Sequence, residues 1–275
     1  MSRAMLVSKI MTALGERIIA GGQSLENDLN LSVILGLRQD QIIKVLEHAS
    51  KPMPDGTLLA PLDKHHEVWA AGVTYLRSRS EREAESTVAD VYARVYEADR
   101  PELFFKSTGG RTTPSGGPIR IRRDSDWNVP EPELVLVINR HGEIVGYTAG
   151  NDVSSRSIEG ENPLYLPQAK CYTGSCAIGS SIKFCSADEM RDLPITLTIH
   201  RGGEVVFHGE TRTSSMNRTY EDLVSYLTRE MDFHHGVFLM TGTGIVPAYP
   251  FSLMAGDRVD ISVGEISLSN TVAPE

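Results

Sequence analysis

This sequence of 275 residues has no long apolar run, only three cysteines and no excess of basic residues. No stretch approaches the roughly 18 consecutive apolar residues of a transmembrane helix, so we expect no membrane span. The three cysteines form no C-x-x-C pair and show no metal-type spacing with histidine. An odd cysteine count without an export signal favours reduced thiols, and we therefore expect a cytoplasmic protein.

The shortage of basic residues bears on the class of partner. The chain has 27 lysines and arginines against 36 aspartates and glutamates, for a net charge of −9. A general nucleic-acid binder needs a basic face, so this balance argues against nucleic acid as a partner. The hydrophobic content of 40% and the charged content of 23% are those of an ordinary globular protein. A chain of this length can bury a full core without disulfides, and the composition fits an enzyme of small molecules.

The N-terminal part differs in pattern from the rest of the chain. Residues 5–10 form a short apolar run interrupted by two polar residues, and no convincing cleavage site follows, so we interpret the run as a helix. The turn-rich residues 51–56 (KPMPDG) end this part. We expect a small N-terminal region over residues 1–60 and a catalytic domain over residues 61–275.

Helical spacing of apolar residues marks three further segments. Residues 40–48 have it, and residues 79–98 show it most clearly before Pro101 ends the pattern. The charged start of residues 79–98 fits either a lid over a site or a solvated surface helix. Residues 220–231 form the third segment, and Thr219 precedes it in a position typical of a helix cap.

Strand patterns dominate the chain after residue 100. They cover residues 102–106, 119–122, 133–138, 143–149, 194–201, 204–208 and 258–263. Two neighbouring pairs are joined by the short turns NRHG and RGG, which is typical of β-hairpins. The pattern as a whole predicts a β-rich α+β fold.

Two glutamates open the strand predicted over residues 133–138. Glu131 and Glu133 are two positions apart, so in a strand they project from the same face with about 7 Å between their Cα atoms. Val135 and Val137 continue that face as an apolar wall. Two partly buried carboxylates repel each other and need a cation or a shared proton. For this pair alone, a solvated strand face is the favoured interpretation, because glutamate is mostly exposed.

A third carboxylate follows from the geometry of the hairpin. A turn at residues 140–142 pairs Leu134 with Thr148, and the same register carries Asp152 to a position beside Glu131. Three oxygen ligands suit a hard cation such as Mg²⁺, Mn²⁺ or Ca²⁺ and not zinc. They also leave positions for water and for a chelating substrate. With Asp152 added, a metal site and a solvated face are about equally favoured.

Three segments together resemble the fumarylacetoacetate hydrolase superfamily: VPEPELVLVI, GYTAGNDVSSRSIEGENPLYLPQAKCYTGSCAIG and TGTGIVP. The resemblance covers roughly residues 69–270. It implies a mixed β-roll of packed sheets with flanking helices, assembled as a homodimer or homotetramer. It also implies that Glu131, Glu133 and Asp152 form the family's E-x-E…D site, which binds Mg²⁺ or, in its place, Mn²⁺ or Ca²⁺.

One segment of the resemblance indicates the reaction. The stretch IEGENPLYLPQAK is most similar to the dehydratase branch that acts on 2-dehydro-3-deoxy-D-arabinonate. Hydrolase members carry N-Y-x-x-H-x-x-E, and Ser78 stands here where their histidine would be. Serine cannot act as a base near neutral pH, which weakens the hydrolase interpretation. His65 and His66 lie a few residues upstream and keep that alternative open.

The resemblance thus implies a Mg²⁺-dependent dehydratase of a 2-oxo-3-deoxy sugar acid, acting through an enolate held by the metal. The first alternative is a metal-dependent hydrolase or decarboxylase of acylpyruvate or fumarylacetoacetate-type 2-oxo acids. The second is a non-catalytic member that binds a 2-oxo acid. Ser157 keeps it open, because related sequences usually have aspartate at this place after Arg156.

Further site residues come from the same resemblance. Lys170, 18 residues after Asp152, has the position of the family's catalytic lysine, although a surface lysine is the ordinary interpretation by sequence alone. Glu161, in the same segment, is the second catalytic candidate. Candidates for binding the substrate are Tyr75, Arg77, Lys106, Gln168, Thr241 and Thr243. The T-G-T-G segment lacks the lysine of a P-loop, so we do not expect nucleotide binding.

Overall fold

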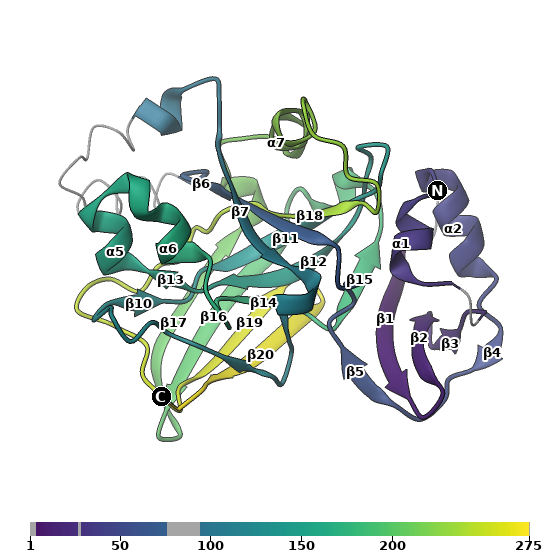
Figure 1. Ribbon diagram of the computed structural model, residues 1–275, viewed down its shortest axis with the longest axis horizontal. Helices are drawn as coiled ribbons and strands as arrows, with labels where there is room; N and C mark the ends of the chain where they lie inside the picture. Colours follow the sequence, from purple (N-terminus) through teal and green to yellow (C-terminus); the bar gives the residue numbers. More distant parts are fainter. Residues whose placement is uncertain (1–3, 27–28, 76–93, 275) are drawn as a thin grey trace.

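The computed structural model describes residues 4–26, 29–75 and 94–274 (Figure 1). The strands are β1 (Met5–Thr12), β2 (Gly15–Ala20), β3 (Gln23–Ser24), β4 (Lys51–Pro52), β5 (Thr57–Leu59), β6 (Glu67–Gly72), β7 (Glu102–Thr108), β8 (Thr113–Pro114), β9 (Pro118–Ile119), β10 (Asn128–Val129), β11 (Pro132–Ile138), β12 (Ile144–Asp152), β13 (Ser154–Ser155), β14 (Cys176–Ile178), β15 (Ser181–Phe184), β16 (Pro194–Arg201), β17 (Glu204–Arg212), β18 (Val237–Met240), β19 (Arg258–Val263) and β20 (Ile266–Val272). The helices are α1 (Leu31–Leu35), α2 (Gln39–Glu47), α5 (Arg156–Glu161), α6 (Leu166–Lys170) and α7 (Tyr220–Leu227), with 3-10 turns η1 (Gly109–Arg111), η2 (Pro163–Tyr165), η3 (Ala187–Met190) and η4 (Thr213–Ser215). Among these described helices, none has the length and apolar character needed to cross a membrane.

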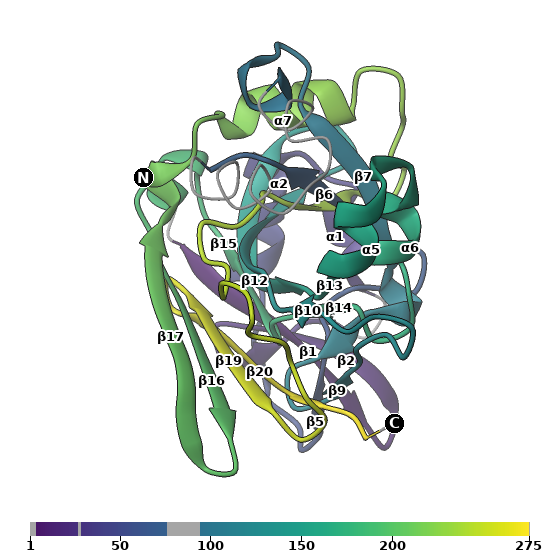
Figure 2. The ribbon, with the colours of Figure 1, turned by 90° about the vertical axis from the view of Figure 1, so that its left-hand side faces the viewer.

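Two large sheets organise the described residues. The first has 13 strands in the order β4-β3-β2-β1-β15-β12-β11-β18-β6-β7, with β5, β8 and β14 paired at its sides. The second has five strands in the order β17-β16-β19-β20-β9, and β10 pairs with β13 in a short separate ladder. Figure 2 shows the second sheet along one side of the molecule and α5 with α6 on the other. This β-rich α+β architecture is the expected mixed β-roll with flanking helices.

Strand β11 lies at the centre, with a core on each of its faces. Leu134 and Leu136 belong to the core shared with the second sheet, whereas Val135 and Val137 belong to the core shared with α1, α2 and the N-terminal strands. Alternate side chains of a strand point to opposite faces, so both faces of β11 are covered. This explains why the segment PELVLVI is apolar after its glutamate and buried throughout.

The helix expected over residues 5–10 is wrong, because these residues lie in strand β1. β1 pairs with β2 through the tight turn at Gly15, where φ is +102°, and with β15 on its other side, where Met5 faces Phe184. A short apolar run does not distinguish a strand from a buried helix, and pairing on both edges decides the matter here. The N-terminal region therefore continues the large sheet, and the boundary after residue 60 stays a prediction.

Most of the remaining predicted elements are confirmed, with shifted ends. Residues 40–48 are helical as α2, and the strands over 194–201 and 258–263 match β16 and β19. The predicted cap is present, because the Thr219 hydroxyl accepts a hydrogen bond from the Asp222 N–H, although α7 ends at Leu227. The strand expected over 119–122 shortens to β9. The helix expected over 79–98 falls mostly outside the described residues.

The register predicted for the central hairpin is wrong by one residue. Leu134 pairs with Ala149 and not with Thr148. A β-bulge between Val137 and Ile138 is the reason, since it leaves one extra residue of β12 unpaired near the turn and shifts every later pair.

Candidate metal centre

Three carboxylates meet at the end of the β11–β12 hairpin. In the observed register Asp152 stands directly opposite Glu131, and its N–H donates to the Glu131 carbonyl at 3.0 Å. One oxygen from each of Glu131, Glu133 and Asp152 lies within 4.8 Å of the others. All three residues are buried, each with at most 3% of its surface exposed. The solvated strand face that the sequence left open is therefore not what the structure shows.

The raised pKa of Glu133 shows that the three carboxylates repel one another when all are charged. Burial raises the pKa of Glu133 well above its ordinary value, and the charges of Asp152 and Glu131 raise it further. The Gly242 N–H, 2.5 Å from Oε2, opposes this effect. Three buried anions at such distances require a compensating cation.

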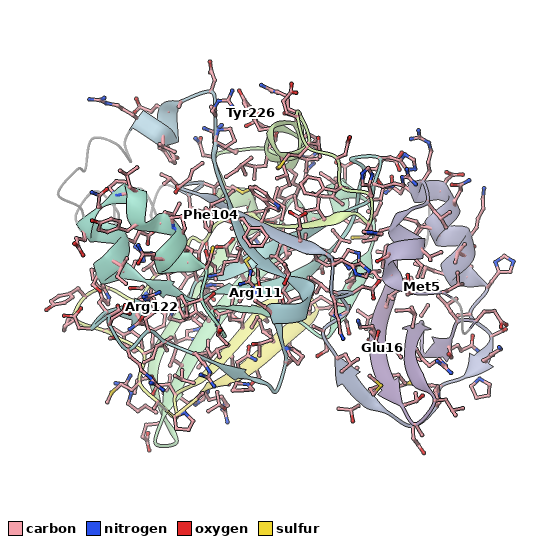
Figure 3. All side chains as sticks on the ribbon, viewed as in Figure 1. Met5, Glu16, Phe104, Arg111, Arg122 and Tyr226 are labelled. Atoms are coloured by element: carbon pink, nitrogen blue, oxygen red, sulfur yellow. The ribbon has the colours of Figure 1, made fainter. Side chains whose placement is uncertain are left out.

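Lys170 supplies part of that compensation. It ends α6 and is fully buried, with Nζ 2.9 Å from Glu131 Oε2, 2.9 Å from Asp152 Oδ2 and 2.6 Å from the Ser154 hydroxyl. The same ammonium lies 5.6 Å from the ring centre of Phe104, near the middle of the molecule in Figure 3. A surface lysine is thus excluded, and Lys170 is in contact with two of the three carboxylates.

Two more buried cations surround the trio. The Nζ of Lys106 lies 2.5 Å from Asp152 Oδ1, and Arg156 Nη2 lies 3.0 Å from Glu131 Oε1. Arg156 Nε in turn lies 3.7 Å from the buried Glu159. Sequence reasoning did not single out Arg156 and Glu159 as site residues. The sequence feature that could have indicated this pair is their spacing of three, which places both side chains on one face of a helix.

The residues present fit a hard divalent cation. The three candidate ligands offer only carboxylate oxygens, which suit Mg²⁺, Mn²⁺ or Ca²⁺. The described part of the chain contains no other cluster of three or more His, Cys, Asp or Glu side chains with this geometry. The trio can therefore bind a metal, and it leaves coordination positions for a chelating ligand.

The predicted substrate-binding residues around the T-G-T-G segment lie close to the trio. Gly242 contacts Glu133 directly, but the Thr241 hydroxyl donates to the Leu134 carbonyl and the Thr243 hydroxyl to the Ile245 carbonyl. Thr241 thus attaches the segment to β11, and Thr243 stabilises the turn itself.

Tyr75 lies beside the same turn and is buried. Its hydroxyl has no hydrogen-bond partner among the described residues. Burial raises the pKa of Tyr75, and Tyr220 and Glu133 add to the effect. The phenol therefore stays protonated and can donate to a ligand.

Two other predicted residues, Gln168 and Glu161, are not brought to the trio. Gln168 is exposed, and its backbone carbonyl accepts a hydrogen bond from Arg122 Nη1 at 3.0 Å. Glu161 is exposed at the end of α5 and lines a surface hollow with Asp124 and Ser157. Arg77 lies outside the described residues.

The two sequence features that kept alternatives open have structural explanations. His66 lies at the opposite end of β6 from Tyr75, where its Nδ1 accepts from the Asp63 N–H and its Nε2 lies 2.9 Å from the His235 carbonyl. It is a structural residue and not a base for the trio. The Ser157 hydroxyl bonds to another serine, Ser125, at 2.8 Å, and Arg156 has its own carboxylate partners.

Known proteins share this fold and much of this sequence. The family model described as fumarylacetoacetate (FAA) hydrolase C-terminal matches residues 67–273. A probable 2-keto-3-deoxyxylonate dehydratase of Haloferax volcanii is 52% identical over 214 residues, which are 77% of this chain and 73% of that protein. A 2-dehydro-3-deoxy-D-arabinonate dehydratase of Saccharolobus solfataricus is 43% identical over 220 residues, 77% of this chain and 72% of that protein.

A solved structure is similar to this chain over nearly its whole length. It is a 2-keto-3-deoxy-D-arabinonate dehydratase complexed with magnesium and 2,5-dioxopentanoate, with a TM-score of 0.79 and 31% sequence identity. The similarity covers 98% of this chain and 99% of that one. It therefore includes the N-terminal region that the family model leaves out.

Proposed function

The chain belongs to the fumarylacetoacetate hydrolase family, and we propose that it is a Mg²⁺-dependent dehydratase of a 2-oxo-3-deoxy sugar acid such as 2-dehydro-3-deoxy-D-arabinonate. The relatives named as dehydratases supply the substrate class. One structural observation carries the chemistry, namely the fully buried Lys170 ammonium in contact with two carboxylates of the trio. No observation on the described residues favours the hydrolase or the non-catalytic alternative over this one.

In this proposal Glu131, Glu133 and Asp152 hold Mg²⁺, the ion named in the solved relative. Mn²⁺ and Ca²⁺ share its preference for oxygen and are second choices. When bound, the cation would draw electrons from the 2-oxo group of the substrate and so acidify the proton on C3.

The protein's own groups would then move protons. We assign to Lys170 one of two roles: in its neutral form it accepts the C3 proton, or as an ammonium it stabilises the enolate that loss of this proton produces. The enolate expels the hydroxyl group of C4, which takes up a proton equivalent to the one removed from C3 and leaves as water. Tautomerisation of the unsaturated product gives a new 2-oxo acid. Tyr75, whose buried hydroxyl has no partner among the described residues, is our candidate for a hydrogen bond to the substrate. The carboxylate trio, Lys170 and Tyr75 are buried, which limits the access of bulk water to these groups.

The test is an assay of purified protein with the stereoisomers of 2-dehydro-3-deoxypentonate and Mg²⁺. We expect water loss and formation of 2,5-dioxopentanoate, the compound found with the solved relative, and no product after chelation of the metal. Release of pyruvate from an acylpyruvate, with no dehydration of any pentonate, would replace this proposal by the hydrolase alternative. Glu204→Gln, a substitution of an exposed residue of β17, is the control and should keep the wild-type activity.

We also propose that the protein works as a homodimer or homotetramer in the cytoplasm. The family resemblance supports the assembly, and the three free cysteines support a reducing compartment. Sedimentation equilibrium of the purified protein measures the assembly directly, and a monomer at all concentrations contradicts it.

A further inference from the structure

Lys106 is a buried cation surrounded by oxygens of the protein itself. Its side chain is 0% exposed, and Nζ donates to the carbonyls of Val153 at 3.2 Å and of Lys170 at 2.5 Å. Its third neighbour is Asp152 Oδ1 at 2.5 Å. An ammonium group has three N–H donors and no acceptor. Two of these donors bond to the carbonyls, and the Asp152 carboxylate is an ion-pair partner, so Lys106 is better placed to hold protein groups than to bind the tail of a substrate.

The two oxygens of Asp152 face different cations. Oδ1 lies against Lys106 but accepts no aligned hydrogen bond from any described residue, so the ion pair is what compensates its charge. Oδ2 lies on the side of the trio, 2.9 Å from the Lys170 ammonium that also contacts Glu131. Lys106 therefore faces Oδ1, and Oδ2 is the oxygen of Asp152 that shares the Lys170 ammonium with Glu131.

We propose that Lys106 is a positioning residue that reserves Oδ1 of Asp152 for its own ammonium and thereby favours Mg²⁺ over Ca²⁺ at the trio. Mg²⁺ demands near-ideal octahedral geometry, whereas Ca²⁺ accepts bidentate carboxylates and a larger, more flexible shell. When Asp152 can offer only one oxygen, Ca²⁺ can no longer gain a bidentate ligand from it. The inference rests on the proposed function and adds to it the selectivity of the same site.

Calorimetric titration of Mg²⁺ and of Ca²⁺ into the wild-type protein, Lys106→Met and Lys9→Met tests the proposal. Lys9 is the matched control, because it is also buried and its Nζ contacts the Leu62 carbonyl and the Asp63 carboxylate, in the N-terminal region. We expect the ratio of the Kd for Ca²⁺ to the Kd for Mg²⁺ to fall about 10-fold in Lys106→Met and to change less than about two-fold in Lys9→Met. An unchanged ratio in folded Lys106→Met overturns the proposal.

A second variant covers the case in which Lys106→Met does not fold. In Lys106→Gln the amide can still donate to the carbonyls of Val153 and Lys170 but presents no charge to Asp152, so selectivity should again be lost. Lys106→Arg keeps a cation and should restore part of it. Wild-type protein that binds Ca²⁺ at least as tightly as Mg²⁺ contradicts the proposal without any variant.

The two proposals fail in different ways. Wild-type protein that binds neither cation removes the metal centre and the proposed function together. Normal dehydration with Mg²⁺, accompanied by a selectivity that Lys106→Met and Lys106→Gln leave unchanged, removes only the role of Lys106.

Discussion

Lys170 shows how far the environment of a residue can depart from what its type suggests. Its ammonium is buried at 2.9 Å from both Glu131 and Asp152, where it compensates the same carboxylates that a metal would use. We therefore predict that Lys170→Met lowers kcat by roughly 10²- to 10⁴-fold, the range for loss of a proton-transferring group.

The same variant should bind Mg²⁺ at least as tightly as the wild-type protein, because the competing cation is gone. Steady-state kinetics and calorimetry on one preparation measure both effects. Lys183→Met, which removes a partly exposed ion pair with Glu265, is the control. Weaker Mg²⁺ binding in Lys170→Met would show that the lysine organises the ligands instead of competing for them.

Glu133 is needed for metal binding in the proposed site, but its charge lowers the stability of the metal-free protein. Because burial and two neighbouring anions raise its pKa, the charged form destabilises the metal-free protein. Glu133→Gln removes the charge, and its amide oxygen can still accept from the Gly242 N–H. We predict a loss of Mg²⁺ affinity of roughly 100-fold or more, together with a free energy of unfolding in chelator that rises by about 1 kcal/mol or more.

Urea denaturation in chelator and Mg²⁺ titration provide the two measurements. Glu143→Gln in the same hairpin is the contrasting variant, since Glu143 accepts hydrogen bonds from the Gln39 N–H and the Asn139 amide. It should lose stability and keep Mg²⁺ affinity. Lower stability of metal-free Glu133→Gln would mean that the trio is already balanced by the protein's own cations.

At the scale of elements, the turn after β18 couples the fold to the trio. Gly242 has φ +89°, and a Cβ there would lie 2.0 Å from the Thr74 hydroxyl and 3.1 Å from the Ala71 carbonyl. Its N–H also donates to Glu133. We predict that Gly242→Ala lowers the free energy of unfolding by roughly 3 kcal/mol or more and weakens Mg²⁺ binding, because Glu133 is displaced.

Gly256→Ala is the matched control for that prediction. Gly256 has nearly the same backbone conformation, φ +87°, but nothing lies within 4 Å of the position of its Cβ. It should lose only about 1 kcal/mol, the part due to backbone strain. Equal losses in the two variants, measured by urea denaturation, would show that the turn has room to adjust.

At the scale of the whole molecule, His66 links the N-terminal region to the central sheet. It precedes β6, its Nε2 lies 2.9 Å from the His235 carbonyl before β18, and Asp63 beside it accepts from Ser32 of α1. Burial lowers the pKa of His66 from 6.5 to about 4. The unfolded chain therefore binds a proton between these pH values that the folded protein does not bind.

Stability that His66 contributes above pH 6.5 is thus lost progressively as the pH falls toward 4. We predict a loss of up to roughly 3 kcal/mol over this interval, measured as the free energy of unfolding in urea. His66→Gln should be less stable near neutral pH and show a flatter pH profile. The exposed His208→Gln variant should keep the wild-type profile, and a flatter profile there would place the effect elsewhere.

Local sequence alone determined the E-x-E…D set and the hairpin that gathers it. Glu131 and Glu133 share a face because strands have a period of two, and Asp152 is close because a short turn returns the chain beside them. Both facts depend on near neighbours in the sequence, which is why the metal ligands could be proposed before the fold was known. The exact pairing could not, since a bulge shifted the register by one residue.

Only the tertiary structure decided what surrounds the trio. The burial of Lys106 depends on β7, which comes from an earlier part of the chain, and the burial of Arg156 and Lys170 depends on how α5 and α6 fold back against the hairpin. Strand β1 likewise exists because β15 pairs with it across more than half the sequence. Charge compensation and strand pairing depend on how separate elements pack, so residue type and local spacing do not predict them. The faces of a strand and the return of a hairpin depend on local geometry, so the sequence does predict those.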